Sequence, residues 1–234
     1  MVVNLENLRS ARSLYYQCLG EVFSFSFSQN RLANLTQYLS AMNECVFDDT
    51  LKTNFAFLLE SLKTPQDMQK LIKEYDLLFL TLKSAIPTTF SYIEEGFENS
   101  NALLLVRQIL IKSKLRRNEA FFKEGEDSVG FCFLLMSEFL REKSDDLAKE
   151  LFEKLINPNI DEFLNLILAN EVALLFKEIA LIGAAFIEFE RFCFELEKPI
   201  KTQSKKVQND LSRSEFLRRE TNKRRKLGKT QEIS

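Results

Sequence analysis

Residues 64–82 read TPQDMQKLIKEYDLLFLTL, and this stretch decides the fold class that the sequence predicts. Its apolar side chains recur every three or four residues, which places them on one face of a helix. They are Met68, Leu71, Ile72, Tyr75, Leu78, Phe79 and Leu82. Thr64 supplies a capping side chain, Pro65 suits the first turn, and Asp67 is an early acid. Together these features predict a long amphipathic helix that begins near Pro65.

The same spacing continues on both sides of this helix and predicts a helical body. Helices are expected at 4–23, about 30–45, 48–63, 100–117, 128–142, 145–156 and 160–169, with a longer one that ends near residue 197. The pattern breaks around Pro87, and Asn157-Pro158-Asn159 is typical of a turn. With only 6 glycines and 4 prolines, the chain has too few turn residues for an all-β fold. The prediction is an all-α, single-domain helical bundle over residues 1–197.

A basic tail follows this predicted body. Residues 198–234 carry 12 lysines and arginines against 4 acids, a net charge of +8, whereas residues 1–197 carry −10. The acidic body does not suggest nucleic-acid binding, but it would attract a positively charged peptide in a salt-dependent way. The chain is therefore divided into a helical domain, 1–197, and a tail, 198–234, that is expected to be partly disordered or helical.

Histidine is absent from all 234 residues, and this absence excludes several kinds of catalytic site. Ser-His and Cys-His nucleophiles and ordinary His-ligated zinc all need that imidazole. The four cysteines lie too far apart for a metal knuckle or a redox dithiol. They are Cys18, Cys45, Cys132 and Cys193. We predict no catalytic residue, no metal site and no cofactor of its own, although catalysis by carboxylates alone stays open.

Phenylalanine is unusually frequent, with 22 residues, while tryptophan is absent. These rings predict an aromatic-rich helical core, and the alternative is an apolar groove for a partner peptide. The N-terminal residues lack the pattern of a secretory signal, and the most apolar later stretch, 179–187, is far too short to span a membrane. We expect a cytoplasmic protein with reduced cysteines and no stable membrane insertion.

Two short motifs go beyond helical periodicity. The first is EYDLLF at 74–79, followed at 87–96 by PTTFSYIEEG. The second is EGEDS at 124–128, followed by a helix that contains Met136 and Leu140. In their order and separation, these motifs resemble those of the TorD/DmsD/NarJ family of molybdoenzyme-specific chaperones. The resemblance covers about residues 1–197, with two departures, because Gly125 stands where the family usually has proline and Ser128 where it usually has histidine.

This resemblance implies a function and a partner. Members of the family bind the twin-arginine leader and the apo form of a molybdopterin oxidoreductase, assist cofactor insertion and delay export until the enzyme is mature. It implies a TorD-like all-helical fold, as a monomer or a homodimer, without catalytic activity. The sequence does not indicate which molybdoenzyme is the client. The alternatives are a helical adaptor or scaffold protein unrelated to molybdoenzymes, and an enzyme.

The motif residues are the candidate leader-binding and client-binding site. They are Glu74, Tyr75, Phe79, Ser91, Tyr92, Glu126, Asp127 and Met136. If the two motif loops meet, their carboxylates would form a mouth beside an apolar groove, suited to two arginines followed by an apolar segment. The alternative is that Tyr75 and Phe79 serve packing and that Asp127 or Ser128 caps the following helix.

The tail contains a further motif. Residues 212–218, SRSEFLR, resemble the twin-arginine consensus Ser-Arg-Arg-x-Phe-Leu-Lys, with Ser214 in place of the second arginine. This motif is a candidate pseudo-substrate for the chaperone's own groove. Its candidate contact residues are Arg213, Phe216, Leu217 and Arg218. The alternative is a solvated charged extension.

Overall fold

A computed structural model describes residues 5–26, 32–81, 85–120 and 122–200. Its elements in chain order are α1 (Leu5–Phe23), α2 (Leu35–Glu44), the 3₁₀ turn η1 (Asp49–Leu51), α3 (Lys52–Ser61), α4 (Pro65–Phe79), α5 (Phe90–Glu95), α6 (Asn101–Lys112), α7 (Val129–Arg141), α8 (Asp145–Leu151), the π turn η2 (Phe152–Ile156), α9 (Asn157–Leu168) and α10 (Leu175–Phe194). Within these ranges the structure is helical without a strand, so the predicted all-α class is confirmed. No described helix combines the length and apolarity needed to cross a membrane.

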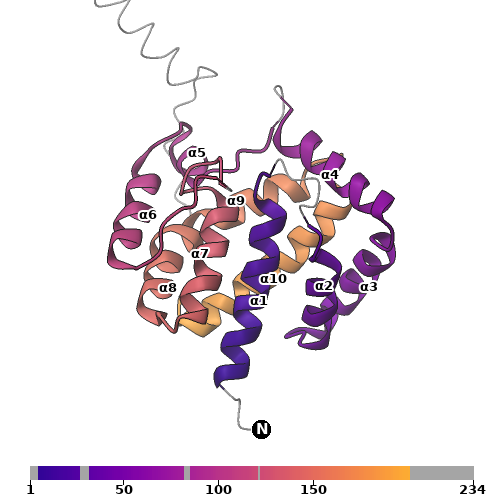
Figure 1. Ribbon diagram of the computed structural model, residues 1–234, viewed down its shortest axis with the longest axis horizontal. Coiled ribbons are helices and arrows are strands. Elements are labelled where there is room, and N and C mark those ends of the chain that lie inside the picture. The colour runs from indigo at the N-terminus through magenta and orange to yellow at the C-terminus, as the bar shows by residue number, and fades with distance from the viewer. Residues whose placement is uncertain (1–4, 27–31, 82–84, 121, 201–234) are drawn as a thin grey trace, which may run out of the picture.

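Helix α1 lies at the front of the molecule and divides it into two groups of helices (Figure 1). Helices α2, α3 and α4 lie on one side, α5 to α8 lie on the other, and α10 passes behind α1. α1 contacts α7 most extensively and also touches α2 and α10. Because one helix contacts both groups, the packing of α1 determines the space between them.

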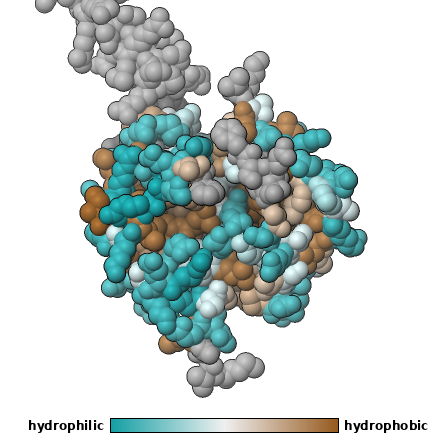
Figure 2. Space-filling model, in the orientation of Figure 1, coloured by the Kyte–Doolittle hydropathy of each residue, from teal (hydrophilic) through white to brown (hydrophobic). Residues whose placement is uncertain are grey.

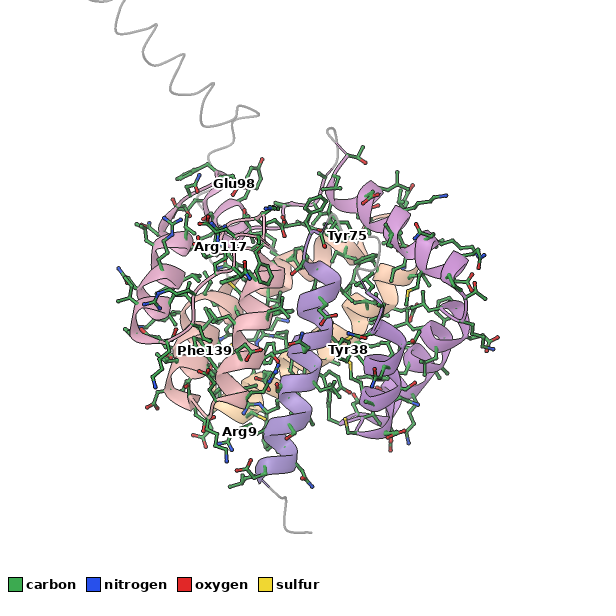
Figure 3. All side chains as sticks on the ribbon, viewed as in Figure 1. Arg9, Tyr38, Tyr75, Glu98, Arg117 and Phe139 are labelled. Carbon is green, nitrogen blue, oxygen red and sulfur yellow. The ribbon has the colours of Figure 1, made fainter. Side chains whose placement is uncertain are left out.

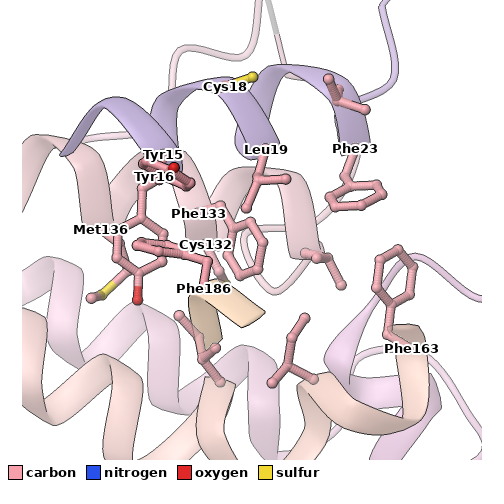
Figure 4. Packing of buried hydrophobic residues seen from close by; sticks show 14 of the residues in the cluster. Tyr15, Tyr16, Cys18, Leu19, Phe23, Cys132, Phe133, Met136, Phe163 and Phe186 are labelled. Atoms are coloured by element: carbon pink, nitrogen blue, oxygen red, sulfur yellow. The ribbon is translucent and has the colours of Figure 1, made fainter. Parts of the chain in front are cut away.

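The core is rich in phenylalanine, as predicted. Tyr16 of α1, Phe133 of α7 and Phe186 of α10 pack edge to face, with ring centroids 5.5 Å and 4.8 Å from that of Tyr16 (Figure 4). Most of the other helices also contribute aromatic side chains that are completely buried. Such contacts add specific geometry to the burial of large apolar surfaces.

Helices α1 and α7 approach each other unusually closely, and two glycines permit this. A Cβ atom added to Gly130 of α7 would lie 2.6 Å from the backbone nitrogen of Ser24. A Cβ atom on Gly20 of α1 would lie 2.7 Å from Cγ of Leu134. Further along, Ser13 and Ser137 each donate a hydroxyl hydrogen bond to the other's carbonyl, at 3.1 Å and 3.0 Å. The two backbones are therefore in direct contact.

Several predicted helix ends are confirmed. The Thr64 hydroxyl accepts a hydrogen bond from the backbone N–H of Asp67, whose carboxylate accepts one from the Thr64 N–H, and Pro65 lies in the first turn of α4. Asp48 caps η1 by accepting from the N–H of Thr50 at 2.9 Å. Ser128 caps α7 by accepting from the N–H of Phe131. Local sequence signals thus determine where these elements begin.

Two other expectations were wrong. The helix expected at 100–117 ends at Lys112, because Arg116 folds back and donates to the carbonyls of Leu110, Ser113 and Leu115. The turn expected at 157–159 is helical, and the chain runs from α8 through η2 directly into α9. Asn157 donates its N–H to the carbonyl of Phe152, five positions earlier, and Pro158 lies in the first turn of α9, where a helix tolerates proline.

We predict that Gly130→Ala destabilises the protein by about 1–3 kcal/mol, because the added methyl group overpacks the α1–α7 contact. Gly183→Ala in α10 is the matched control, since a Cβ atom there would lie 3.5 Å from its nearest neighbour, Cδ2 of Leu164 in α9. That control should be neutral or stabilising by up to about 1 kcal/mol, because alanine favours helix more than glycine does. Urea unfolding of both variants tests this, and equal stability would contradict it.

Candidate functional site

The two motif loops lie against each other, as the candidate site required. Thr89 and Ser128 form an isolated antiparallel bridge. The N–H of Val129 donates to the carbonyl of Thr88 at 2.8 Å, and the N–H of Phe90 donates to the carbonyl of Asp127 at 2.9 Å. Segments almost forty residues apart in sequence are thus joined by backbone hydrogen bonds.

Asp127 is buried between these loops, with 2% of its surface exposed. Its carboxylate accepts a hydrogen bond from the N–H of Ser91 at 3.1 Å, in the first turn of α5. The Ser91 hydroxyl is fully buried and accepts in turn from the N–H of Ser100 at 3.1 Å. Both motif side chains therefore satisfy buried backbone donors, and Ser128 rather than Asp127 caps α7.

Glu74 has an equally definite structural role. Its carboxylate accepts hydrogen bonds from the N–H groups of Leu174, Leu175 and Phe176, at 2.8, 3.1 and 2.8 Å. These donors are at the start of α10, where a helix leaves N–H groups without intrahelical partners and favours a negative charge. A side chain of α4 thus caps a helix that begins a hundred residues later.

The remaining predicted site residues are mostly buried too. Tyr75 and Phe79 pack together with ring centroids 4.8 Å apart, and Phe79 continues into the aromatic core. Met136 is fully buried in α7. Glu126 is largely covered and pairs with Arg107 and Arg117, whereas Tyr92 is 46% exposed. Of the eight residues, Tyr92 and Glu126 are the ones that are not buried. The tail residues 213–218 lie outside the described ranges.

We expect Glu74→Gln to destabilise the protein by about 1–3 kcal/mol, because the neutral amide gives the start of α10 a weaker acceptor and no charge. Glu171→Gln, an exposed position just before the same helix, is the control and should change little. Denaturant unfolding measures both variants. Equal stability of Glu74→Gln and the wild type would show that the cap contributes nothing.

A cleft of about 460 Å³ opens beside this structural framework. It lies between the end of α1 and the start of α2 on one side and the end of α6 and α7 on the other. Its apolar lining comes from Phe25, Leu110, Phe122, Phe131, Leu134 and Leu135. On the face shown in Figure 2, apolar side chains gather around a hollow near the middle of the molecule, with hydrophilic side chains about them.

Glu21 places a carboxylate in the wall of this cleft. It accepts hydrogen bonds from the Tyr38 hydroxyl at 3.0 Å and from Nε2 of Gln17 at 2.7 Å, both neutral donors. Figure 3 shows Tyr38 on α2 beside α1. Within the described ranges no lysine or arginine pairs with Glu21, while Glu138 at the rim pairs with Arg141 at 2.9 Å. The cleft therefore offers a cation an acceptor that no lysine or arginine of the described residues pairs with.

Burial, and to a lesser extent the hydrogen bond to Glu21, raises the pKa of Tyr38 above its ordinary value. No sequence pattern pointed to Glu21, because it lies in no motif and its surroundings come from four separate segments. Arg116 also lines the cleft, but its guanidinium is occupied by backbone carbonyls. Sequence reasoning therefore missed the residue that gives the cleft its charge.

Glu124 connects the cleft to the motif loops. Its carboxylate accepts a hydrogen bond from the N–H of Phe25 at 3.1 Å and one from the Thr88 hydroxyl at 2.8 Å. Phe25 is part of the cleft wall, so one carboxylate holds that wall against the first motif loop. Burial raises the pKa of Glu124, the Asp127 carboxylate adds to the increase, and the two hydrogen bonds oppose it.

This raised pKa predicts a pH dependence. The folded protein holds the Glu124 proton more tightly than the unfolded chain, so Glu124 reduces stability as the pH rises through its unfolded pKa of about 4.3. The wild type should therefore gain stability relative to Glu124→Gln as the pH is lowered from neutral towards about 4.3, where the unfolded chain also takes up the proton. Glutamine can still accept from Phe25 and donate to Thr88, so the fold should be retained.

Urea unfolding at several pH values measures this effect. Glu44→Gln, an exposed position at the end of α2, is the control and should follow the wild-type pH profile. Parallel profiles for Glu124→Gln and the wild type would contradict the assignment of this pH dependence to Glu124.

An apolar cleft with a carboxylate in its wall, in an all-helical body, is typical of proteins that bind an apolar segment of a partner. The sequence matches the nitrate reductase delta subunit family over residues 44–169, more than half of the chain. The chain therefore belongs to this family of NarJ/TorD-type maturation chaperones, and the resemblance carried by the two motifs is confirmed. Membership places it among chaperones of redox-enzyme maturation and gives no support to an unrelated adaptor.

The fold has a relative among solved structures. A crystal structure from Archaeoglobus fulgidus, described as a proposed redox enzyme maturation protein, matches with a TM-score of 0.51 and 17% sequence identity. The match covers 76% of this chain and 93% of that chain. At this identity the similarity shows the fold alone. No curated protein sequence matches the chain.

Proposed function

We propose that this protein is a cytoplasmic chaperone that binds the twin-arginine leader and the apo form of a molybdopterin oxidoreductase. In this role it assists cofactor insertion and delays export until the enzyme is mature. The observation that supports the proposal most directly is the apolar cleft with Glu21 in its wall. Family membership supports the class of client.

The chemistry of such a leader fits the cleft. A leader presents two arginines followed by an apolar segment. The Glu21 carboxylate can accept two parallel hydrogen bonds from a guanidinium, and Glu138 at the rim, paired with Arg141, is a second carboxylate. The phenylalanine and leucine side chains of the lining suit the apolar segment, which enters as a helix in a groove.

The motif residues belong to this proposal in a different way. We assign Glu74, Ser91 and Asp127 to holding helices and loops in place, through the hydrogen bonds described above. Tyr92 and Glu126 are the two predicted site residues that solvent reaches, so they are the candidates for direct contact with a client.

Calorimetry with a synthetic peptide tests the proposal. The probe is Ser-Arg-Arg-Asn-Phe-Leu-Lys followed by about seven leucine and alanine residues, roughly two helical turns. We expect Glu21→Gln to weaken binding by about 1–3 kcal/mol, the magnitude of a lost charged hydrogen bond. Glu44→Gln, a change of the same chemistry outside the cleft, should leave the affinity unchanged.

A change in the peptide completes the test. If Glu21 contacts a peptide arginine, replacing both arginines by glutamine should remove most of the difference between Glu21→Gln and the wild type. Equal binding of arginine and glutamine peptides by the wild-type protein would refute leader recognition by this cleft. Circular dichroism of each variant confirms that the fold is retained.

A further inference from the structure

A second apolar cleft adjoins the first. It has a volume of about 630 Å³ and lies between α2, the end of α3 and the start of α4. Its apolar lining comes from Leu59, Leu62, Pro65, Met68 and Ile72. Leu32 and Ala33 line both clefts. The two clefts therefore lie on either side of one short segment.

Leu32 has an unusual conformation in this segment. Its φ angle is +68°, a left-handed conformation that a bulky side chain rarely adopts, and only 6% of its surface is exposed. Its carbonyl accepts a hydrogen bond from the N–H of Leu35 at 3.0 Å, which ties it to the start of α2. Strained residues of this kind persist where the surroundings hold them, and they are frequent at ligand-binding positions.

Charge distinguishes the two clefts. The first cleft carries Glu21, with which no lysine or arginine pairs within the described ranges, Glu138, which pairs with Arg141, and Arg116, whose guanidinium is bound by backbone carbonyls. Among the described residues that line the second cleft, the charged one is Lys63, which pairs with Glu60 on the surface at 2.5 Å. An end that offers the Glu21 carboxylate, followed by an apolar end, complements a peptide whose basic residues precede an apolar run.

We propose that the two clefts form one docking trough for an apolar peptide segment that follows a pair of basic residues. The basic residues lie at Glu21 and Glu138, the apolar segment crosses Leu32 and Ala33, and its far end occupies the second cleft. The identity of the peptide as a leader rests on the proposed function. The trough adds the direction of binding and a length requirement, because only a longer apolar segment reaches α4.

Two synthetic peptides test the trough. Both begin Ser-Arg-Arg-Asn-Phe-Leu-Lys, and their apolar segments are about seven and about fourteen residues long, roughly two and four helical turns. We expect the wild type to bind the long peptide at least about tenfold more tightly than the short one, because burial of the added apolar residues is favourable. Met68→Glu, which puts a charge in the second cleft, should abolish that difference and leave binding of the short peptide unchanged.

Two further variants keep the test independent of one side chain. Thr36→Glu charges the opposite wall of the second cleft, on α2, and should act like Met68→Glu. Leu77→Glu, an exposed position of α4 outside the cleft lining, is the matched control and should change neither affinity. Equal binding of the two peptides by the wild type, or equal loss of both in Met68→Glu, overturns the trough.

Other occupants of the second cleft would give different results. A change of oligomeric state in Met68→Glu, seen by sedimentation, would assign the cleft to a second copy of the chain. If deletion of residues 201–234 tightens binding of the long peptide but not of the short one, the second cleft is assigned to the tail. Either result overturns the trough proposal. Failure of both peptides to bind would refute the proposed function itself.

Discussion

The close contact of α1 with α7 is the constraint on which the rest of the structure depends. Gly20 and Gly130 let the two backbones meet, and the serine pair between Ser13 and Ser137 satisfies their buried hydroxyls. Because α1 also touches α2 and α10, this contact sets the distance between the two groups of helices. The cleft opens where α1 ends and α6 and α2 diverge from it, so its width follows from the α1–α7 contact.

Carboxylates in this protein serve two different purposes, and the extent to which each side chain is buried distinguishes one purpose from the other. Glu74 and Asp127 accept hydrogen bonds from backbone N–H groups that helix and loop ends would otherwise leave unpaired. Glu190 is fully buried and is held by the Arg12 guanidinium and the Tyr16 hydroxyl, yet burial still raises its pKa. Glu21, in contrast, accepts from two neutral donors, meets no cationic one among the described residues, and faces a cleft. The acids of the recognised motifs are therefore mainly architectural, while the acid suited to a ligand lies outside them.

The sequence predicted what depends on neighbouring residues and missed what depends on distant ones. Thr64, Pro65 and Asp67 lie within four positions, so the start of α4 could be predicted in detail. The role of Glu74 required knowing that residues 174–176 begin a helix beside it. Pro158 and its neighbours suggested a turn. In the structure they continue helically from the π turn η2, which has no simple sequence signal. The cleft combines four segments, and periodicity says nothing about which helices leave space between them.

The two departures from the family pattern have local physical reasons. A Cβ atom on Gly125 would lie 2.7 Å from Oδ1 of Asp127, so glycine leaves room for the carboxylate that holds Ser91. Ser128 donates its N–H to the carbonyl of Gly125 at 3.0 Å and caps α7 with its hydroxyl. Serine is among the strongest capping residues, so the replacement strengthens the start of the helix that carries Gly130. In this chain the hydroxyl of Ser128 therefore serves to cap α7, the helix that packs against α1.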